Sequence, residues 1–136
     1  MFTPFRKKWI QAVKERGGID CLRKPRVQKE LAIKADPVPA VAAGFDGLKR
    51  PDLWKAGEQK VQTLLRKFVR ERLAGYHEHR DSPARDATSI LSPYLALGIL
   101  SPGQCLSQAL GINGGRLDGG QEGAVTWITE IGRAHV

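Results

Sequence analysis

The sequence has few cysteines and no long apolar run, and these absences exclude several classes of protein. Its two cysteines, Cys21 and Cys105, are far apart and form no C-x-x-C pair, so neither a disulfide framework nor a zinc site is expected. No segment approaches the ~18 consecutive apolar residues of a membrane-spanning helix, and the first residues show no signal-peptide pattern. We therefore expect a cytoplasmic protein with reduced thiols and no membrane contact.

The motifs of common catalytic and nucleotide-binding sites are also missing. There is no P-loop, no Rossmann glycine fingerprint and no Ser-His-Asp set. His77 and His79 are two residues apart, which puts them on different faces of a helix, and no Cys or Asp pattern surrounds them. We expect both histidines to face solvent, and the sequence predicts neither a metal site nor a catalytic residue.

Acidic residues are a minority, because 22 Lys and Arg residues stand against 14 Asp and Glu residues and give a net charge of +8. Such an excess favours a polyanionic partner but carries no information on the fold. The 136 residues, 41% hydrophobic and 26% charged, fit one small globular domain. Composition alone thus leaves open a small basic module that binds nucleic acid through charge.

Helical periods are present where strand alternation is missing, so the predicted fold class is all-α. The strongest helix is predicted over residues 57–76, whose apolar side chains recur at helical spacing: Val61, Leu64, Leu65, Phe68, Val69 and Leu73. A first helix is expected after Thr3 as N-cap and Pro4 at its first position, ending at Gly17 and Gly18. Its apolar face is Phe5, Trp9 and Val13.

Ser-Pro pairs mark the starts of two shorter helices. Ser92 and Ser101 are the predicted N-caps, and Gln104 completes a capping box with Ser101. A glycine-rich loop is expected over residues 111–120, followed by a further helix over 122–131.

A long stretch from about residue 18 to 53 shows no sustained period. It contains Pro25, Pro37, Pro39 and Pro51 among scattered glycines and alanines, and it reads as an irregular connector. Because a compact autonomous domain rarely contains such a stretch, we expect the chain to be part of a larger protein.

Candidate anion-binding groups gather around the segment "TSILS". Thr88, Ser89 and Ser92 supply hydroxyls just before a helix, whose N-terminal dipole end attracts anions. Tyr76 and Arg80 are four residues apart and would share a helical face, from which a phenol and a guanidinium could hold phosphate. Each signal alone is weak, because it is more typical of an ordinary helix cap or helix end. Trp127 and Glu130, one turn apart, are in turn typical of core and surface positions.

Taken together and in order, four segments resemble the DNA photolyase and cryptochrome flavoprotein family. They are "FTPFRKKW", "WKAGEQKVQTLLRKFVRERLAGYHEHRD", "TSILSPYLALGILSPGQCL" and "TWITE", which cover the chain apart from the connector and the last residues. The resemblance implies an interdomain helix and connector over 1–53 and the start of the helical FAD-binding domain over 54–130. The α/β antenna domain of the family is then absent.

The resemblance also implies roles for individual residues. Tyr76 and Trp127 match flavin-pocket residues, Arg80 matches a contact to the DNA backbone, and Glu130 matches a residue of the flavin pocket that contacts the pyrimidine dimer. The segment that wraps the FAD phosphates corresponds to Thr88, Ser89, Ile90, Leu91 and Ser92. In the family, light-excited reduced FAD donates an electron to a cyclobutane pyrimidine dimer in damaged DNA, the ring splits and the electron returns. We expect a monomer, and nothing indicates the antenna chromophore.

The sequence departs from the family pattern at two places. Ile90 stands where the family commonly has Arg, which removes a cation near the phosphates. After "TWITE" the family continues into a Trp-Arg-Glu-Phe stretch, whereas this chain reads "IGRAHV". Back-translation of these six residues allows ATC GGA AGA GCA CAC GTC, the start of a common sequencing adapter. We therefore interpret residues 131–136 as an artefactual tail.

Three functions remain open from the sequence. The first is a fragment of a class I type cyclobutane pyrimidine dimer photolyase, the second is a cryptochrome-type blue-light receptor, and the third is the basic nucleic-acid-binding module. Because the antenna domain and the later family helices are missing, we expect the 136-residue chain alone to bind FAD weakly and to repair no DNA.

Overall fold

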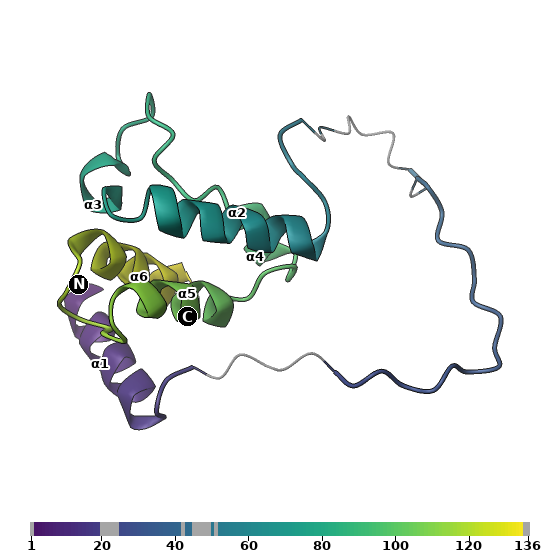
Figure 1. Cartoon of the computed structure of the whole chain (residues 1–136), viewed down its shortest axis with the longest axis horizontal. Helices are drawn as coiled ribbons and strands as arrows, with labels where there is room; N and C mark the ends of the chain where they lie inside the picture. Colours follow the sequence, from purple (N-terminus) through teal and green to yellow (C-terminus); the bar gives the residue numbers. More distant parts are fainter. Residues whose placement is uncertain (1, 20–24, 42, 45–49, 51, 135–136) are drawn as a thin grey trace. The chain divides into compact units, whose positions relative to one another are not determined.

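The chain is helical in the computed structural model, which describes residues 2–19, 25–41, 43–44, 50 and 52–134. These residues form helices and no strand (Figure 1), which confirms the all-α prediction. The helices are α1 (Phe2–Glu15), α2 (Glu58–Glu71), α3 (Tyr76–His79), α4 (Ser92–Ala96), α5 (Pro102–Ile112) and α6 (Glu122–Ala134). The chain divides into two units: Met1–Cys21 with Ala56–Val136, and Leu22–Lys55.

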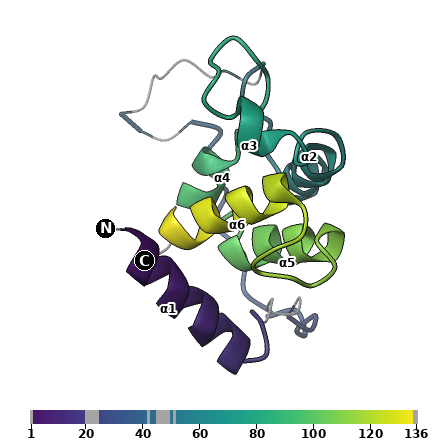
Figure 2. The same cartoon turned by 90° about the vertical axis from the view of Figure 1, so that its left-hand side faces the viewer.

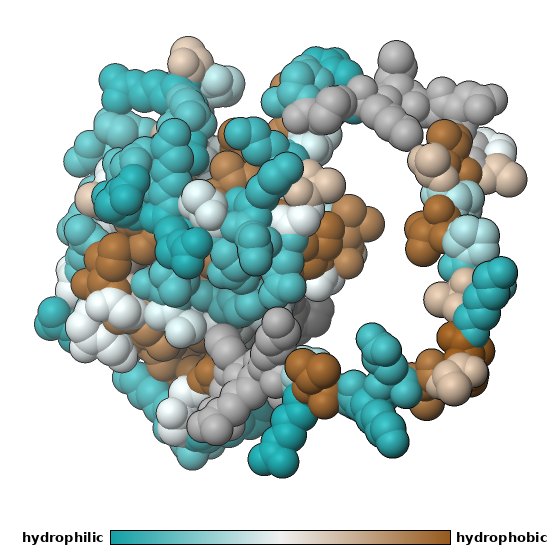
Figure 3. All heavy atoms as spheres, turned by 45° about the vertical axis from the view of Figure 1, so that its right-hand side comes forward, coloured by the Kyte–Doolittle hydropathy of each residue, from teal (hydrophilic) through white to brown (hydrophobic). Residues whose placement is uncertain are grey.

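The second unit is irregular, as the prolines predicted. Its described residues contain no helix or strand, and their side chains are exposed. Figure 3 shows hydrophobic and hydrophilic side chains mixed along it. The large hydrophobic residues exposed there are Val27, Leu31, Ile33, Val38, Val41, Leu53 and Trp54. The role of this unit as an interdomain connector stays a prediction, and Cys21 lies outside the described residues.

The first unit is organised around α6. This helix packs against α1, α3 and α5, and α5 also packs against α2, as Figures 1 and 2 let the reader follow. The apolar stripe predicted for α2 is confirmed, since Val61, Leu65 and Phe68 are fully buried. Other side chains with almost no exposure are Leu73, Leu91, Leu100, Cys105, Leu106, Ala109, Ala124 and Ile128.

Helix α1 begins earlier than the sequence indicated. It starts at Phe2, so the prediction of Thr3 as N-cap is wrong and Pro4 lies within the first turn. Proline is tolerated there because first-turn amides have no intrahelical acceptor. Val13 is buried, as predicted, and Trp9 lies against Gly132 of α6.

Helix α2 ends five residues before the predicted position of 76. The amides of Arg72 and Leu73 both donate to the carbonyl of Phe68, at 2.9 and 3.0 Å, so the regular ladder stops there. Residues 72–75 form a turn before α3, and Gly123 of α6 lies directly against the carbonyls of Leu73 and Ala74. The apolar pattern in the sequence extends past the end of α2 because Leu73, which lies in the turn, is also buried.

Of the two caps predicted at Ser-Pro pairs, one is present. The Ser101 hydroxyl accepts from the Gln104 amide at 3.2 Å and the Gln104 side chain accepts from the Ser101 amide at 2.8 Å, which confirms the capping box. The prediction of Ser92 as N-cap is wrong, because Leu91 is the N-cap of α4 and Ser92 is already helical. The Leu91 carbonyl accepts from the amides of both Tyr94 and Leu95 at 3.0 Å, which starts the helix one residue earlier.

The glycine-rich loop between α5 and α6 is built around Asn113. Its side chain is 2% exposed. The side-chain Nδ2 of Asn113 donates to the backbone carbonyls of Arg116 at 2.6 Å and Gly119 at 3.0 Å. Its Oδ1 accepts a hydrogen bond from the backbone amide of Gln121 at 2.8 Å. Gly120 packs so closely on Oδ1 that a Cβ there would overlap it. One side chain therefore closes the whole loop.

Asn113→Ala is expected to lower the free energy of unfolding by about 2–3 kcal/mol, because three backbone groups lose their hydrogen bonds to the buried Asn113 side chain. Urea denaturation followed by circular dichroism measures this change. Gln121→Ala is the matched control, since the Gln121 side chain is exposed and only its backbone amide takes part. Equal stabilities of the two variants would contradict the role of Asn113.

Candidate functional site

A pocket of about 270 Å³ lies between α3, the segment before α4, and helices α5 and α6. It brings together all eight residues that the resemblance assigns to the cofactor: Tyr76, Thr88, Ser89, Ile90, Leu91, Ser92, Trp127 and Glu130. Four further lining residues were missed by the sequence reasoning: Leu95, Pro102, Cys105 and Ile131. Their only local signal is apolar character, which does not separate a pocket wall from a core.

Phe68 packs against the two aromatic residues that line the pocket, Tyr76 and Trp127. The Phe68 ring is edge-on to Tyr76, with centroids 5.8 Å apart, and tilted against Trp127 at 4.9 Å. Phe68 is fully buried, whereas Tyr76 is partly exposed and Trp127 is 4% exposed. The sequence predicted Phe68 as core, and the structure adds that it positions two pocket residues.

The segment before α4 offers polar groups to the pocket. Among the described residues, the amides of Thr88, Ser89, Ile90 and Leu91 and the hydroxyls of Thr88 and Ser89 have no recorded hydrogen-bond partner. Ile90 has a φ of 52°, a left-handed conformation that is rare for a β-branched residue, and Leu91 follows it with helical angles. Consecutive left-handed and right-handed residues are the backbone pattern of nests, in which successive amides can bind an anion.

Arg72 ties this segment to the end of α2. Its Nη1 forms an ion pair with the Asp86 carboxylate and lies 3.3 Å from the Asp86 carbonyl, while the guanidinium lies 5.6 Å from the centre of the Phe68 ring. Arg72 therefore holds the backbone two residues before Thr88, and its guanidinium lies over the same phenylalanine that contacts Tyr76 and Trp127.

Glu130 is the one charged residue in the described lining, and two arginines flank it. Arg80 Nη1 lies 2.8 Å from Glu130 Oε1, and Arg133 Nη1 lies 3.6 Å from Glu130 Oε2. The hydrogen bond to Glu130 raises the pKa of Arg80 above its ordinary value, so this guanidinium stays charged. Arg80 itself does not line the pocket. The two residues that the resemblance assigns to DNA thus bind each other at the pocket rim.

Burial, and then the negative charge of Glu130, raise the pKa of the Tyr76 phenol. Glu130→Gln is therefore expected to lower that pKa, because it removes the charge and releases Arg80 beside the phenol. Carbon-13 NMR titration of labelled tyrosine measures it, with Tyr76→Phe to assign the resonance. An unchanged Tyr76 pKa in Glu130→Gln would contradict the coupling. Since the folded pKa is raised, the contribution of Tyr76 to stability is fully present below the unfolded value of about 10 and is lost as pH rises from there through the folded pKa.

The prediction that both histidines face solvent is wrong for His77. Its Nε2 lies 3.2 Å from a Glu122 carboxylate oxygen, because α3 packs against α6. Its Nδ1 is buried and has no hydrogen-bond partner among the described residues. His79 is more exposed, and its Nδ1 lies 3.0 Å from Arg85 Nη1.

In the part of the chain that is described, no helix has the length and apolar character needed to cross a bilayer.

Comparison with known proteins places this arrangement in context. No family model matches the chain. The deoxyribodipyrimidine photo-lyases of Vibrio cholerae and Escherichia coli are each 34% identical to it over 96% of its length, and that of Neurospora crassa is 30% identical over 96%. The chain covers 28%, 27% and 23% of these relatives. It therefore spans about a quarter of the curated relatives that it matches and is homologous to that part of them.

Proposed function

We propose that this chain, homologous to one part of deoxyribodipyrimidine photo-lyases, is the start of the flavin-binding helical domain of such an enzyme. The parent protein would be a DNA-repair lyase that splits cyclobutane pyrimidine dimers in light. The observation that carries the proposal is the convergence of eight residues, spread from 76 to 130 in the sequence, on one pocket.

The chemistry of the pocket fits a flavin dinucleotide. Phosphate oxygens suit the amides and hydroxyls of Thr88 and Ser89 before α4, and a planar apolar ring suits the wall made by Tyr76 and Trp127. At about 270 Å³ the pocket is smaller than most cofactor sites, so this chain holds only part of the molecule. Reduced FAD, when bound and excited by light, would supply the electron for dimer splitting.

The residues around the rim then serve the DNA. Arg80 keeps the Glu130 carboxylate oriented at the pocket edge, where it can accept a hydrogen bond from an extruded base. Arg80 can contact a phosphate at the same rim. The net charge of +8 favours association with damaged DNA. We further propose a cytoplasmic monomer, with an interdomain helix and an irregular connector over residues 1–53.

The test begins with the genomic locus. In the genomic sequence, the codons that follow codon 130 should encode residues other than "IGRAHV". If the genome encodes "IGRAHV" there, the interpretation of residues 131–136 as an artefactual tail is wrong. The complete protein should purify with flavin absorbance and should repair a dimer-containing oligonucleotide in blue light but not in darkness. Bound flavin without repair would favour the cryptochrome alternative, and DNA binding without flavin would favour the basic module.

Within the complete protein, Thr88→Ala with Ser89→Ala is expected to weaken flavin binding about tenfold or more, since two hydrogen bonds to a charged group are lost. Equilibrium dialysis of FAD measures the dissociation constant. Ser107→Ala is the matched control, because Ser107 is exposed on α5 and does not line the pocket. Equal affinities in the two variants would contradict the phosphate role of the segment.

A further inference from the structure

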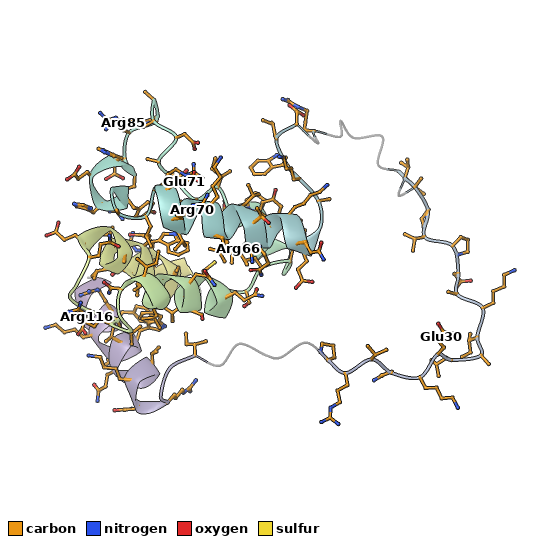
Figure 4. All side chains as sticks on the ribbon, in the orientation of Figure 1. Glu30, Arg66, Arg70, Glu71, Arg85 and Arg116 are labelled. Atoms are coloured by element: carbon orange, nitrogen blue, oxygen red, sulfur yellow. The ribbon has the colours of Figure 1, made fainter. Side chains whose placement is uncertain are left out.

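The outer side of α2 carries four cations. Lys60, Arg66, Lys67 and Arg70 are exposed there. We call these four residues the basic face. At 100° per residue they fall within about 120° of the helix surface. They lie opposite the buried stripe of α2, and Figure 4 shows Arg66 and Arg70 on this helix.

Internal ion pairs neutralise little of this charge. Glu71 is shared by Arg70, at 2.6 Å, and Lys67, at 4.0 Å. The hydrogen bond from Arg70, and then the charge of Lys67, lower the pKa of Glu71, so it is ionised at neutral pH. Within the described residues Lys60 and Arg66 form no ion pair, and Arg66 only donates to the Thr63 hydroxyl at 3.4 Å. Four cations therefore face one carboxylate.

The length of the basic face suits a polyanion with closely spaced charges. From Lys60 to Arg70 the helix rises about 15 Å, at 1.5 Å per residue. One strand of duplex DNA presents a phosphate every 3.4 Å of axis, so about four phosphates occupy that length. We propose that the basic face binds the phosphate backbone of double-stranded DNA without reading its sequence. The choice of DNA rests on the proposed function, but undamaged duplex without flavin is sufficient for the test.

This surface is distinct from the pocket. The buried side of α2 carries Phe68, whose ring contacts Tyr76 and Trp127, so the basic face points away from these pocket residues. Contact there would anchor the protein to DNA of any sequence. Contact at the pocket rim would instead depend on the lesion.

The experiment measures binding of the 136-residue chain to a fluorescent undamaged duplex by anisotropy between 50 and 200 mM salt. In K60Q/R66Q/K67Q/R70Q the slope of log affinity against log salt should be shallower by up to about 3.6, at about 0.9 per phosphate contact. Over this salt range the unmodified chain should then lose up to about 150-fold more affinity than the variant. Because the four residues are exposed, helicity and thermal midpoint should stay unchanged.

The matched control removes the same charge elsewhere. K7Q/K8Q/K29Q/K34Q replaces four exposed lysines of α1 and the irregular unit, and it should change the slope by less than about 1. If the fourfold variant unfolds, K60Q/R66Q leaves the pairs with Glu71 intact and should still make the slope shallower by about 1.8. Equal losses in variant and control would overturn the proposal. Binding to anionic phospholipid vesicles but not to duplex would overturn it as well.

Glu71→Gln provides a test of opposite sign. Removing the carboxylate releases Lys67 and Arg70 for phosphate, so affinity for the duplex should rise several-fold at low salt. General damage to the fold would instead lower affinity. A decrease in Glu71→Gln with unchanged helicity would therefore count against the basic face.

Discussion

Gly123→Ala is expected to destabilise the protein by about 3 kcal/mol, one of the two largest effects that we predict. A Cβ at position 123 would overlap the carbonyl oxygen of Leu73 and lie 2.5 Å from that of Ala74. Both obstacles are backbone atoms, which cannot rotate aside as a side chain end can. Helix α6 would have to move away from the turn after α2, and Trp127 would move with it.

Gly111→Ala is the control for this substitution. Gly111 also lies in a helix, and a Cβ there meets no atom within 4 Å. Alanine is a better helix former than glycine, so stability should rise by about 0.5–1 kcal/mol. Thermal and urea denaturation followed by circular dichroism compare the two variants. A fully stable Gly123→Ala protein would mean that α6 does not approach Leu73 as closely as described.

Phe68→Ala is expected to lower the free energy of unfolding by about 3–5 kcal/mol, because it leaves a cavity where a fully buried ring stood. The cavity would lie beside three side chains that contact the Phe68 ring. They are the rings of Tyr76 and Trp127 and the guanidinium of Arg72. We therefore expect weaker near-ultraviolet circular dichroism from Trp127 even under conditions where the helices persist.

Phe68→Leu separates the loss of volume from the loss of the ring. It fills most of the space and should cost clearly less than alanine, while still changing the aromatic signal. Leu97→Ala is the matched surface control, because Leu97 is 74% exposed and its truncation should change stability by less than about 0.5 kcal/mol. A similar cost for Leu97→Ala and Phe68→Ala would contradict the central position of Phe68.

Sequence patterns predicted those features that depend on a few neighbouring residues. The Ser101 capping box was predictable because both of its hydrogen bonds lie within four residues. The buried stripe of α2 was predictable because helical spacing alone decides which side chains share a face. Ser92 shows the limit of such reasoning: its Ser-Pro pair is similar to that of Ser101, but the Leu91 carbonyl already starts the helix.

The pocket could not be derived from local pattern. Its lining comes from four helices and the segment before α4, and only the family resemblance connected Tyr76 with Trp127 before the structure did. Neither the local pattern nor the resemblance predicted the contacts of Phe68 and Arg72 that hold the lining residues in place. The contact of Arg72 with Asp86 joins residues 14 apart, with α3 between them, and no periodic signal marks such a pair.

The interruption between α2 and α3 determines how far apart two aromatic rings lie. In an unbroken helix, the eight residues from Phe68 to Tyr76 would separate their positions by about 12 Å along the axis. The ring centroids are instead 5.8 Å apart, because the turn at 72–75 folds the chain back. The turn thus acts as a spacer of fixed length, and a deletion or insertion within it would detach Tyr76 from the aromatic wall even if every side chain of the pocket were kept.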